Sequence, residues 1–311
     1  MNRVIAFGEV LEDYVLNDNN EYIKLVGGAP LNFLATCSKL DSDCYLITCL
    51  SNDDGSKRVF KMIEKENIHA TYIKYDYSTI LCHSKVSVDK ITGEREFFFY
   101  KDNASFLSLN EEDIKEEYFK ENDLFQCGSV CLLNENIYKA QLKAIKLAIK
   151  NNNVISFDTN FRPSLFKQEE QKKLVNSFLP YVDILKLSID ELIILTDLNN
   201  ETDNINELFD HYQNLKMIFL TKGSNGISLY FRNREMIFQQ SIKVKKMIDT
   251  IGCGDCSYGS FISFFMNNNE INKDNIDYLN KDLYKKALLK SCQVGALVCS
   301  IKGCLPLPDI K

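Results

Sequence analysis

The run Asp249-Thr-Ile-Gly-Cys-Gly-Asp255 leads directly into an apolar helical stretch, residues 256–266. Its two glycines flank one small residue, so the backbone N–H groups of residues 252–254 can turn inward without obstruction by a Cβ atom. The helix N-terminus adds a partial positive charge that suits a phosphate. An aspartate there would repel a bound anion, but it can take a proton while phosphate charge develops beside it. The run indicates phosphoryl transfer; the alternative is a glycine-rich helix start with Asp255 near its N-cap.

The segment Gly27-Gly-Ala-Pro-Leu-Asn32 opens a helix that the apolar spacing predicts over residues 30–40. Paired glycines let a ligand approach the backbone closely, and the amide of Asn32 can both donate to and accept from a hydroxyl group. A carbohydrate requires such two-way partners. Taken alone, the segment is equally a glycine-rich turn with a proline suited to the first turn of a helix.

Polar residues also follow a predicted strand at residues 154–157, in the segment Asp158-Thr-Asn160-Phe-Arg162. If the backbone stays extended, the period of two places the side chains of Asp158, Asn160 and Arg162 on one face. Arg162 is then a candidate charge clamp for a transition state. The alternative is a polar cluster at the end of a strand.

Two further polar segments follow predicted strands. Ser188 and Glu191 have the S-x-x-E spacing of a capping box, which is a sufficient structural explanation for both. Residues 221–226, Thr-Lys-Gly-Ser-Asn-Gly, form a tight turn whose glycines can lie close to a ligand, or a plain turn between two strands.

The elements that position these residues alternate along the chain. Short β-rich runs are predicted as strands at 4–7, 44–49, 124–126, 154–157, 184–187 and 217–221, and amphipathic stretches as helices at 30–40, 56–66, 137–150, 169–179 and 191–195. This alternation predicts an α/β fold: a doubly wound, mostly parallel sheet covered by helices on both faces, in three layers. Ligands of such sheets bind at the carboxyl ends of the strands, where the polar segments occur.

Two regions interrupt the alternation. Residues 80–100 contain two β runs joined by a turn at 89–93, and residues 10–26 form a second hairpin that turns at 17–20. We expect a small β lid, residues 10–26 and 80–107, on a main domain of residues 1–9, 27–79 and 108–311. The alternative is a pair of surface hairpins without a role.

Composition restricts the partners. The net charge is −6 and the sequence pI about 5.3, and the basic residues form no long run, so nucleic acid is not an expected partner. No apolar run approaches the ~20 residues of a membrane-spanning helix, and the N-terminus lacks the apolar core of a signal peptide. The eleven scattered cysteines indicate small core residues in a reducing compartment. We therefore expect a cytoplasmic protein without a membrane partner.

The motifs stand in the order in which the PfkB, or ribokinase-like, family of sugar kinases carries them. Residues 249–255 resemble the family signature, residues 27–32 its GG(A/S)xxN sugar motif, and residues 158–162 its DxNxR motif. Residues 302–306 resemble the C-terminal KGAxPSLP motif, with Cys304 where alanine is usual. The resemblance spans nearly the whole chain, and no GxGxxG follows the first strand as a Rossmann dehydrogenase would require.

The resemblance implies a role for each matching residue. The catalytic groups would be Asp255, Arg162 and the backbone N–H groups of Gly252, Cys253 and Gly254. The sugar would be bound by Asp13, Gly27, Gly28, Asn32, Phe97, Asn160 and Arg162. ATP would be bound by Lys186, Ser188, Thr221, Gly223, Gly226 and Gly254. For Asp13, an alternative is a solvated residue of the first hairpin.

Two metal ions are implied by the same resemblance. Glu191 matches the glutamate of the family's NxxE motif, which acts on Mg²⁺ through water, although Ser188 stands where many members have asparagine. A potassium ion behind the anion cradle would be held by the carboxylate of Asp249 and by carbonyl groups, those of Ile251, Val298 and Gly303. The cofactors we expect are Mg²⁺ with ATP, and K⁺.

The acceptor follows from the branch that the chain resembles. Residues 27–30 and 93–100 look like the fructokinase branch, in which GGAPxN and GERxFxF are common. Lys101 stands where arginine is frequent and lacks its bidentate fork, which disfavours a carboxylate-bearing acceptor such as 2-keto-3-deoxygluconate. Phe106 falls where this branch often has aspartate.

We expect an ATP-dependent kinase that phosphorylates a small carbohydrate, fructose at its 6-hydroxyl. The alternatives are ribokinase or 2-keto-3-deoxygluconate kinase activity and, in another class, a non-catalytic relative that senses a sugar or nucleotide. An exposed lid face with apolar residues such as Phe97, Phe99 and Ile80 predicts a homodimer formed through the lid.

Overall fold

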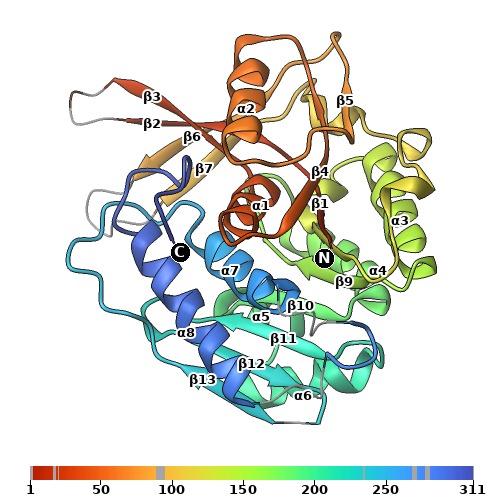
Figure 1. Ribbon diagram of the computed structural model, residues 1–311, viewed down its shortest axis with the longest axis vertical. Coiled ribbons are helices and arrows are strands. Elements are labelled where there is room, and N and C mark those ends of the chain that lie inside the picture. The colour runs from red at the N-terminus through yellow and green to blue at the C-terminus, as the bar shows by residue number, and fades with distance from the viewer. Residues whose placement is uncertain are drawn as a thin grey trace.

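The computed structural model describes residues 3–16, 19, 21–88, 95–233, 235–267, 272–276 and 281–310, without the side chains of 87, 88 and 95–97. A central sheet runs through the molecule in the strand order β13-β12-β11-β10-β9-β8-β1-β4-β5 (Figure 1). All neighbours from β11 to β5 pair in parallel, and β12 and β13 add an antiparallel edge. The strands are β1 Arg3–Phe7, β4 Asp43–Leu50, β5 Ile73–Tyr75, β8 Leu124–Gly128, β9 Val154–Asp158, β10 Ile184–Ser188, β11 Met217–Thr221, β12 Ile227–Phe231 and β13 Met236–Gln239.

Alternate side chains of β1 enter two different cores. Val4 and Ala6 pack into one apolar cluster, whereas Ile5 and Phe7 pack into the other, as the period of two along a strand dictates. The first cluster lies under α1 Ala29–Lys39, α2 Asp54–Lys65, α7 Cys253–Asn267 and α8 Lys281–Val298. The second lies under α3 Glu135–Lys150, α4 Gln168–Phe178, α5 Ile189–Thr196 and α6 Glu201–His211. The predicted three-layer α/β architecture is confirmed.

A second, four-stranded sheet forms beside the main one in the order β3-β2-β6-β7 (Figure 1). Its strands are β2 Leu11–Leu16, β3 Tyr22–Gly27, β6 Cys82–Val88 and β7 Arg95–Tyr100. Both hairpins that the sequence predicts are present, and they join through a parallel pairing of β2 with β6. Residues 17, 18 and 20 of the turn predicted at 17–20, and all of residues 89–93, lie outside the described residues.

Short 3-10 turns occur at Ser105–Ser108, Glu111–Asp113, Glu116–Tyr118, Ser129–Leu132, Leu179–Tyr181 and Gly223–Asn225.

The six predicted strands and five predicted helices are all observed, with ends that differ by a few residues. The strands β5 and β13 and the helices α6 and α8 were not predicted, and β12 was anticipated only in the alternative for residues 221–226, a plain turn between two strands. Helix α7 begins at Cys253, three residues before the predicted apolar stretch, so the glycine-rich run itself forms the first turn. Within the described residues, none of the helices is both long and apolar enough to cross a membrane.

Candidate active site

The N-terminus of α7 has the backbone geometry that its glycines predict. Gly252 has φ +71°, and a Cβ atom there would lie 2.6 Å from Cβ of Cys304, so only glycine fits without displacing the C-terminal loop. Among the described residues, no hydrogen bond engages the N–H of Gly252 or of Gly254. The N–H of Cys253 differs from our expectation, because it donates to the carbonyl oxygen of Thr250 at 3.3 Å. Two of the three predicted N–H groups are therefore available to an anion.

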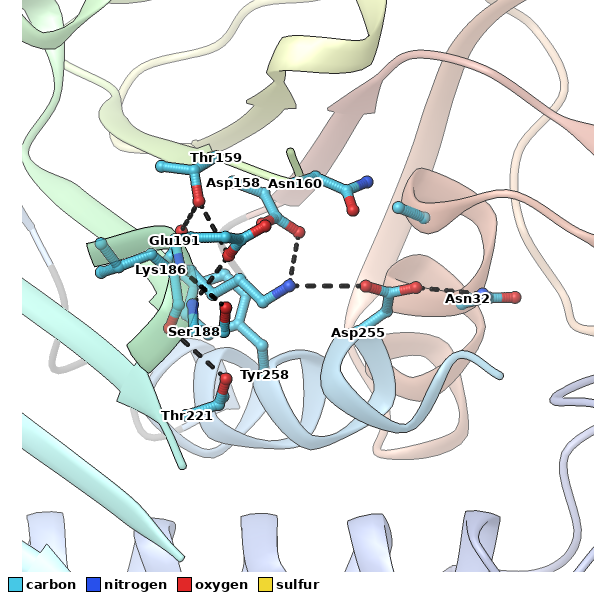
Figure 2. A network of polar contacts seen from close by, with 12 residues as sticks. Asn32, Asp158, Thr159, Asn160, Lys186, Ser188, Glu191, Thr221, Asp255 and Tyr258 are labelled. Atoms are coloured by element: carbon cyan, nitrogen blue, oxygen red, sulfur yellow. Dashed lines mark hydrogen bonds and ion pairs between the residues drawn. The ribbon is translucent and has the colours of Figure 1, made fainter. Parts of the chain in front are cut away.

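Asp255 lies in the first turn of α7, with its carboxylate held from both sides (Figure 2). Nδ2 of Asn32 donates to Oδ2 at 3.1 Å, and Nζ of Lys186 lies 3.6 Å from Oδ1. The side chain is 16% exposed, so it is largely shielded from water but still reaches the cavity in front of it. The arrangement holds one carboxylate in place beside an anion cradle, as a general base requires.

Lys186 links Asp255 to a second carboxylate, that of Asp158, with Nζ 2.7 Å from Oδ2 (Figure 2). The two residues meet because β9 and β10 are neighbours and their register pairs Lys186 with Asp158. Both side chains are buried. Burial alone would lower the pKa of Lys186, but the attraction of Asp158, Asp255 and Glu191 outweighs it and raises that pKa. Lys186 therefore carries a permanent positive charge beside the cradle.

The segment after β9 reaches the site by a different path from the one expected. The strand ends at Asp158, and Asn160 has φ 37°, so the backbone is not extended and the period-two argument for this segment is wrong. Asn160 and Arg162 nevertheless line the cavity beside Asp255. A left-handed asparagine achieves this, because its short polar side chain tolerates that conformation.

The cavity in front of Asp255 has a volume of about 480 Å³ and is bounded by the lid, α1 and the ends of β9 and β10. Five of the residues that were predicted to bind the sugar, the acceptor of the phosphoryl group, line it: Asp13, Gly28, Asn32, Asn160 and Arg162. We call it the acceptor cavity. Asp13 is buried and accepts a hydrogen bond from Oγ of Ser84, so it is not the solvated hairpin residue of the alternative.

The two glycines that precede α1 fit closely around this cavity. Gly28 has φ +113°, and a Cβ atom there would lie 2.5 Å from the carbonyl oxygen of Glu9. A Cβ atom on Gly27 would lie 3.2 Å from Oδ2 of Asp13, so a larger residue there would crowd this carboxylate. Gly27 is not among the residues that line the cavity itself.

The side chain of Phe97 lies outside the described residues. Phe99 lines the acceptor cavity, so the expectation that it belongs to an exposed lid face is wrong.

Sequence reasoning missed Glu9, which lines the acceptor cavity and is only 6% exposed. Burial, with a smaller contribution from the charge of Asp255, raises the pKa of Glu9 to about 7, although a backbone hydrogen bond and Arg162 oppose the shift. Glu9 follows β1 closely, so the rule that sites form at the carboxyl ends of parallel strands could have identified it.

A second, larger cavity of about 650 Å³ adjoins the first. Thr221, Gly223 and Gly226, which were predicted to bind ATP, line it together with Lys243 and apolar side chains of residues 242–247. Thr221, Thr250 and Gly254 border both cavities, so the cradle of α7 lies at their junction. We call this larger space the nucleotide cavity. Lys186 and Ser188, predicted to bind ATP, line the acceptor cavity instead.

Glu191 forms the capping box that its spacing predicts. Its Oε2 accepts from the N–H of Ser188 at 2.7 Å and from Oγ1 of Thr159 at 3.0 Å (Figure 2). Its Oε1 accepts from the N–H of Phe161 at 2.7 Å. The residue also borders the acceptor cavity. In the part of the chain that the structure describes, no three His, Cys, Asp or Glu residues are grouped to hold a metal ion. Contact of Glu191 with Mg²⁺ through water stays a prediction.

Asp249 joins the loop before α7 to the loop after α8. Its Oδ1 accepts from the N–H of Ile251 at 2.8 Å and its Oδ2 from the N–H of Gly303 at 3.1 Å. The expected potassium ligands Asp249, Ile251 and Gly303 therefore lie close together, and Val298 ends the adjoining helix. Potassium binding stays a prediction.

Comparison with known proteins decides which family carries this site. The chain matches the pfkB family of carbohydrate kinases over residues 1–309. It belongs to that family. The protein is accordingly a sugar kinase, and the resemblance of its motifs is confirmed.

Relatives and solved structures agree with this membership. The sequence is 27% identical to probable fructokinase-2 of Arabidopsis thaliana, over 97% of this chain and 92% of the relative, and 27% identical to fructokinase-2 of Oryza sativa, over 99% and 92%. The fold resembles that of Xylella fastidiosa fructokinase with bound ATP, with a TM-score of 0.86 and 19% identity over 99% of this chain and 96% of that one. Aminoimidazole riboside kinase of Salmonella enterica has a TM-score of 0.83 at 20% identity, over 99% and 98%.

Proposed function

We propose that this sugar kinase is an ATP-dependent fructokinase that transfers the γ-phosphoryl group to the 6-hydroxyl of fructose. The observation that carries the proposal is the position of Asp255 and the cradle of α7 between two adjoining cavities. One cavity offers hydroxyl-binding groups and the other the glycine loop of a nucleotide site. The 27% identity to plant fructokinases supports the same acceptor.

The proposed reaction uses groups that already surround the junction. Asp255 accepts the proton of the attacking hydroxyl, while Asn32 and Lys186 keep its carboxylate in place. The N–H groups of Gly252 and Gly254 face the transferred phosphoryl group, whose developing charge the helix N-terminus and the cations beside it stabilise. Lys186 is a better candidate for stabilising this developing charge than for binding ATP in the nucleotide cavity, because it borders the acceptor cavity.

Mg²⁺ bound with ATP would neutralise phosphate charge, and Glu191 is the residue here that fits such an ion. Both of its oxygens already accept hydrogen bonds, so we propose contact through water, where the remaining lone pairs suffice. We also propose that K⁺ binds behind the cradle beside Asp249. Exchange of K⁺ for a bulky organic cation should then depress activity, and unchanged turnover would contradict the site.

The charges around the acceptor cavity favour a neutral sugar. Glu9, Asp13, Glu191 and Asp255 border it, and the cations that line it are Arg162 and Lys186. An acceptor that carries a carboxylate would meet four acidic side chains and two cationic ones. This supports fructose or ribose over 2-keto-3-deoxygluconate.

A coupled ADP-release assay with Mg-ATP tests the acceptor directly. We expect the highest kcat/KM for fructose among fructose, ribose, 2-keto-3-deoxygluconate, adenosine and fructose 6-phosphate. A higher kcat/KM for ribose or for the keto acid would overturn the acceptor and leave the kinase assignment intact. If none of these compounds were phosphorylated, the non-catalytic sensing relative would become the better account.

We further propose a homodimer that forms through the lid. The outer face of the small sheet exposes Leu16, Tyr22, Phe98 and Tyr100, and Ile80 is exposed beside it. Such an apolar surface favours self-association. Light scattering at micromolar concentration should give twice the monomer mass, and a monomer would refute the dimer.

We also propose a cytoplasmic location. It is supported by the eleven cysteines, which are all free thiols, as is usual in a reducing compartment.

A further inference from the structure

Two thiols meet at the wall of the nucleotide cavity. Sγ of Cys253, the first residue of α7, lies 3.1 Å from Sγ of Cys299, which follows the last residue of α8. Both side chains are partly exposed, and both line the nucleotide cavity. The pair therefore faces the space that a small molecule can enter.

The packing of α7 on α8 explains the approach. Gly295 lies opposite Cys253, whose thiol donates to the Gly295 carbonyl oxygen at 3.2 Å. A Cβ atom on Gly295 would lie 3.5 Å from that sulfur, so the site accommodates the thiol without strain. The N–H of Cys299 donates to the same carbonyl, which brings its side chain to the same end of α8. A disulfide has an S–S distance of about 2.0 Å, so the sulfurs need to move closer by roughly 1 Å.

A second pair provides a contrast within the same helix. Sγ of Cys256 lies 2.9 Å from Sγ of Cys304, but both residues are buried and neither lines the nucleotide cavity. Cys253 and Cys256 also have Cys-x-x-Cys spacing, which is frequent in redox sites, yet each thiol approaches a different partner. Distance alone would favour the buried pair, whereas access of a reagent favours the pair at the cavity.

We propose that Cys253 and Cys299 form a thiol modification site, which low-molecular-weight disulfides enter through the nucleotide cavity and oxidise to a reversible intramolecular disulfide. One protein thiolate attacks a sulfur of the small disulfide, forms a mixed disulfide and releases one small thiolate. The other protein thiol loses its proton to that thiolate and attacks the protein sulfur of the mixed disulfide, releasing the second small thiolate, which takes up a proton from water. Two protein thiols are oxidised and one small disulfide is reduced to two thiols.

The consequence for activity rests on the proposed function, whereas formation of the bond does not. Cys253 stands between Gly252 and Gly254, so a bond from its side chain to the end of α8 would shift the cradle. A displacement of about 1 Å at a reacting centre can reduce the rate about 10²-fold. Bound nucleotide would also cover both sulfurs. We therefore expect oxidation to lower activity and Mg-ATP to slow oxidation.

Peptide mapping after treatment with oxidised glutathione tests the bond itself. Trypsin cleavage after Lys246, Lys273, Lys290 and Lys302 places Cys253 and Cys256 in one peptide, Cys292 and Cys299 in a second, and Cys304 in a third. We expect a linkage between the first two peptides that dithiothreitol reverses and that Mg-ATP retards. A linkage of the first peptide to the third, or a loop within the first, would overturn the proposal.

Two matched variants complete the test on the intact protein. Cys299→Ser should lose the linkage and carry at most a mixed disulfide with glutathione on Cys253, whereas Cys304→Ser should form the linkage and, after treatment, lose on the order of tenfold or more in kcat/KM for ATP. Thermal melts establish that both variants fold. If Cys299→Ser still formed the linkage between the first two peptides, or if Cys304→Ser did not form it, the proposal would be wrong. If the reduced enzyme phosphorylated no acceptor, the proposed function would fail, and the peptide map would still decide on the disulfide.

Discussion

The acceptor cavity and the nucleotide cavity meet at one helix N-terminus but are built from different materials. The acceptor cavity is bordered by Glu9, Asp13, Asp255, Arg162 and Lys186, several of them buried and held by hydrogen bonds or ion pairs. The nucleotide cavity is larger and is bordered by the glycine loop, by small residues of α7 and α8, by the apolar side chains of Ile242, Val244 and Met247, and by one charged side chain, that of Lys243.

This difference indicates how the two spaces divide the work. Charged groups in a largely buried site have strong effects on protonation and on transition-state charge, so chemistry is expected on the acceptor side. A cavity bordered mainly by glycines and apolar side chains, with a single lysine, binds chiefly by shape and through its backbone. Changes on the acceptor side should therefore alter kcat and the pH dependence, whereas changes on the nucleotide side should alter the KM for ATP.

The largest effect is expected for Asp255→Asn. Loss of the general base should lower kcat by ~10²–10⁴-fold, while the dissociation constant of ATP stays nearly unchanged because Asp255 borders the acceptor cavity. Steady-state kinetics and calorimetric titration with ATP measure the two quantities. Asp190→Asn is a matched control, since Asp190 also lies in the first turn of a helix but is exposed. Near-normal turnover of the Asp255 variant would remove the catalytic assignment.

The next effect concerns the ion pair beneath the acceptor cavity. Lys186→Met would leave the carboxylate of Asp158 buried without its partner at 2.7 Å, which should cost ~3–5 kcal/mol of unfolding free energy. The double variant Lys186→Met/Asp158→Asn should recover a large part of that loss, because residue 158 then no longer carries a buried charge. Urea unfolding provides the measurement. Lys139→Met, which breaks the exposed pair with Glu135, should cost less than about 1 kcal/mol; an equal cost at both sites would argue against a special role for burial.

The sequence predicted the main sheet and its flanking helices well because apolar periodicity is a local signal. The same holds for the glycines of α7, whose spacing limits what the backbone can do. Contacts between distant segments could not be predicted in this way. The pairing of Lys186 with Asp158 depends on the register of two strands, and the left-handed conformation of Asn160 ended an extension that the sequence pattern favours.

Side-chain direction in the lid was harder still to predict. Phe98 and Phe99 are adjacent and both aromatic, so composition does not determine which of them faces the cavity. The register of β7 against β6 decides it, and a shift by one residue would exchange the two faces. Glu9 was missed for a different reason, since a single glutamate beside a glycine carries no spacing pattern.

The pH dependence of stability isolates one acidic group of the acceptor cavity. The folded-state pKa of Glu9, about 7, lies above the ordinary value of 4.5, so the folded protein binds the extra proton between these values and loses stability as pH rises through them. Glu9→Gln should remove this penalty and be more stable than the unmodified protein at pH 8 by on the order of 2 kcal/mol, with little difference at pH 4.5. Denaturant unfolding at the two pH values checks this.

An exposed glutamate supplies the control for that experiment. Glu121→Gln should leave the difference in stability between the two pH values unchanged, because its side chain stays in water in the folded state. If Glu9→Gln showed no gain at pH 8, burial of the Glu9 carboxylate in the charged form would carry no cost, contrary to its position.

The smallest effects should separate the two cavities most clearly. Gly28 and Gly226 have φ +113° and +109°, and a Cβ atom would lie 2.5 Å from the carbonyl oxygen of Glu9 in the first case and 2.1 Å from that of Gln239 in the second. Gly28→Ala should raise the KM for the sugar, and Gly226→Ala the KM for ATP, each by on the order of tenfold, because the displaced backbone borders one cavity only. Gly223→Ala is the control: its φ is +55°, and nothing lies within 4 Å of the added atom, so its effect on the KM for ATP should be smaller. If Gly28→Ala and Gly226→Ala raised both KM values equally, the two cavities would be one coupled site, and the division between chemistry and shape would have to be abandoned.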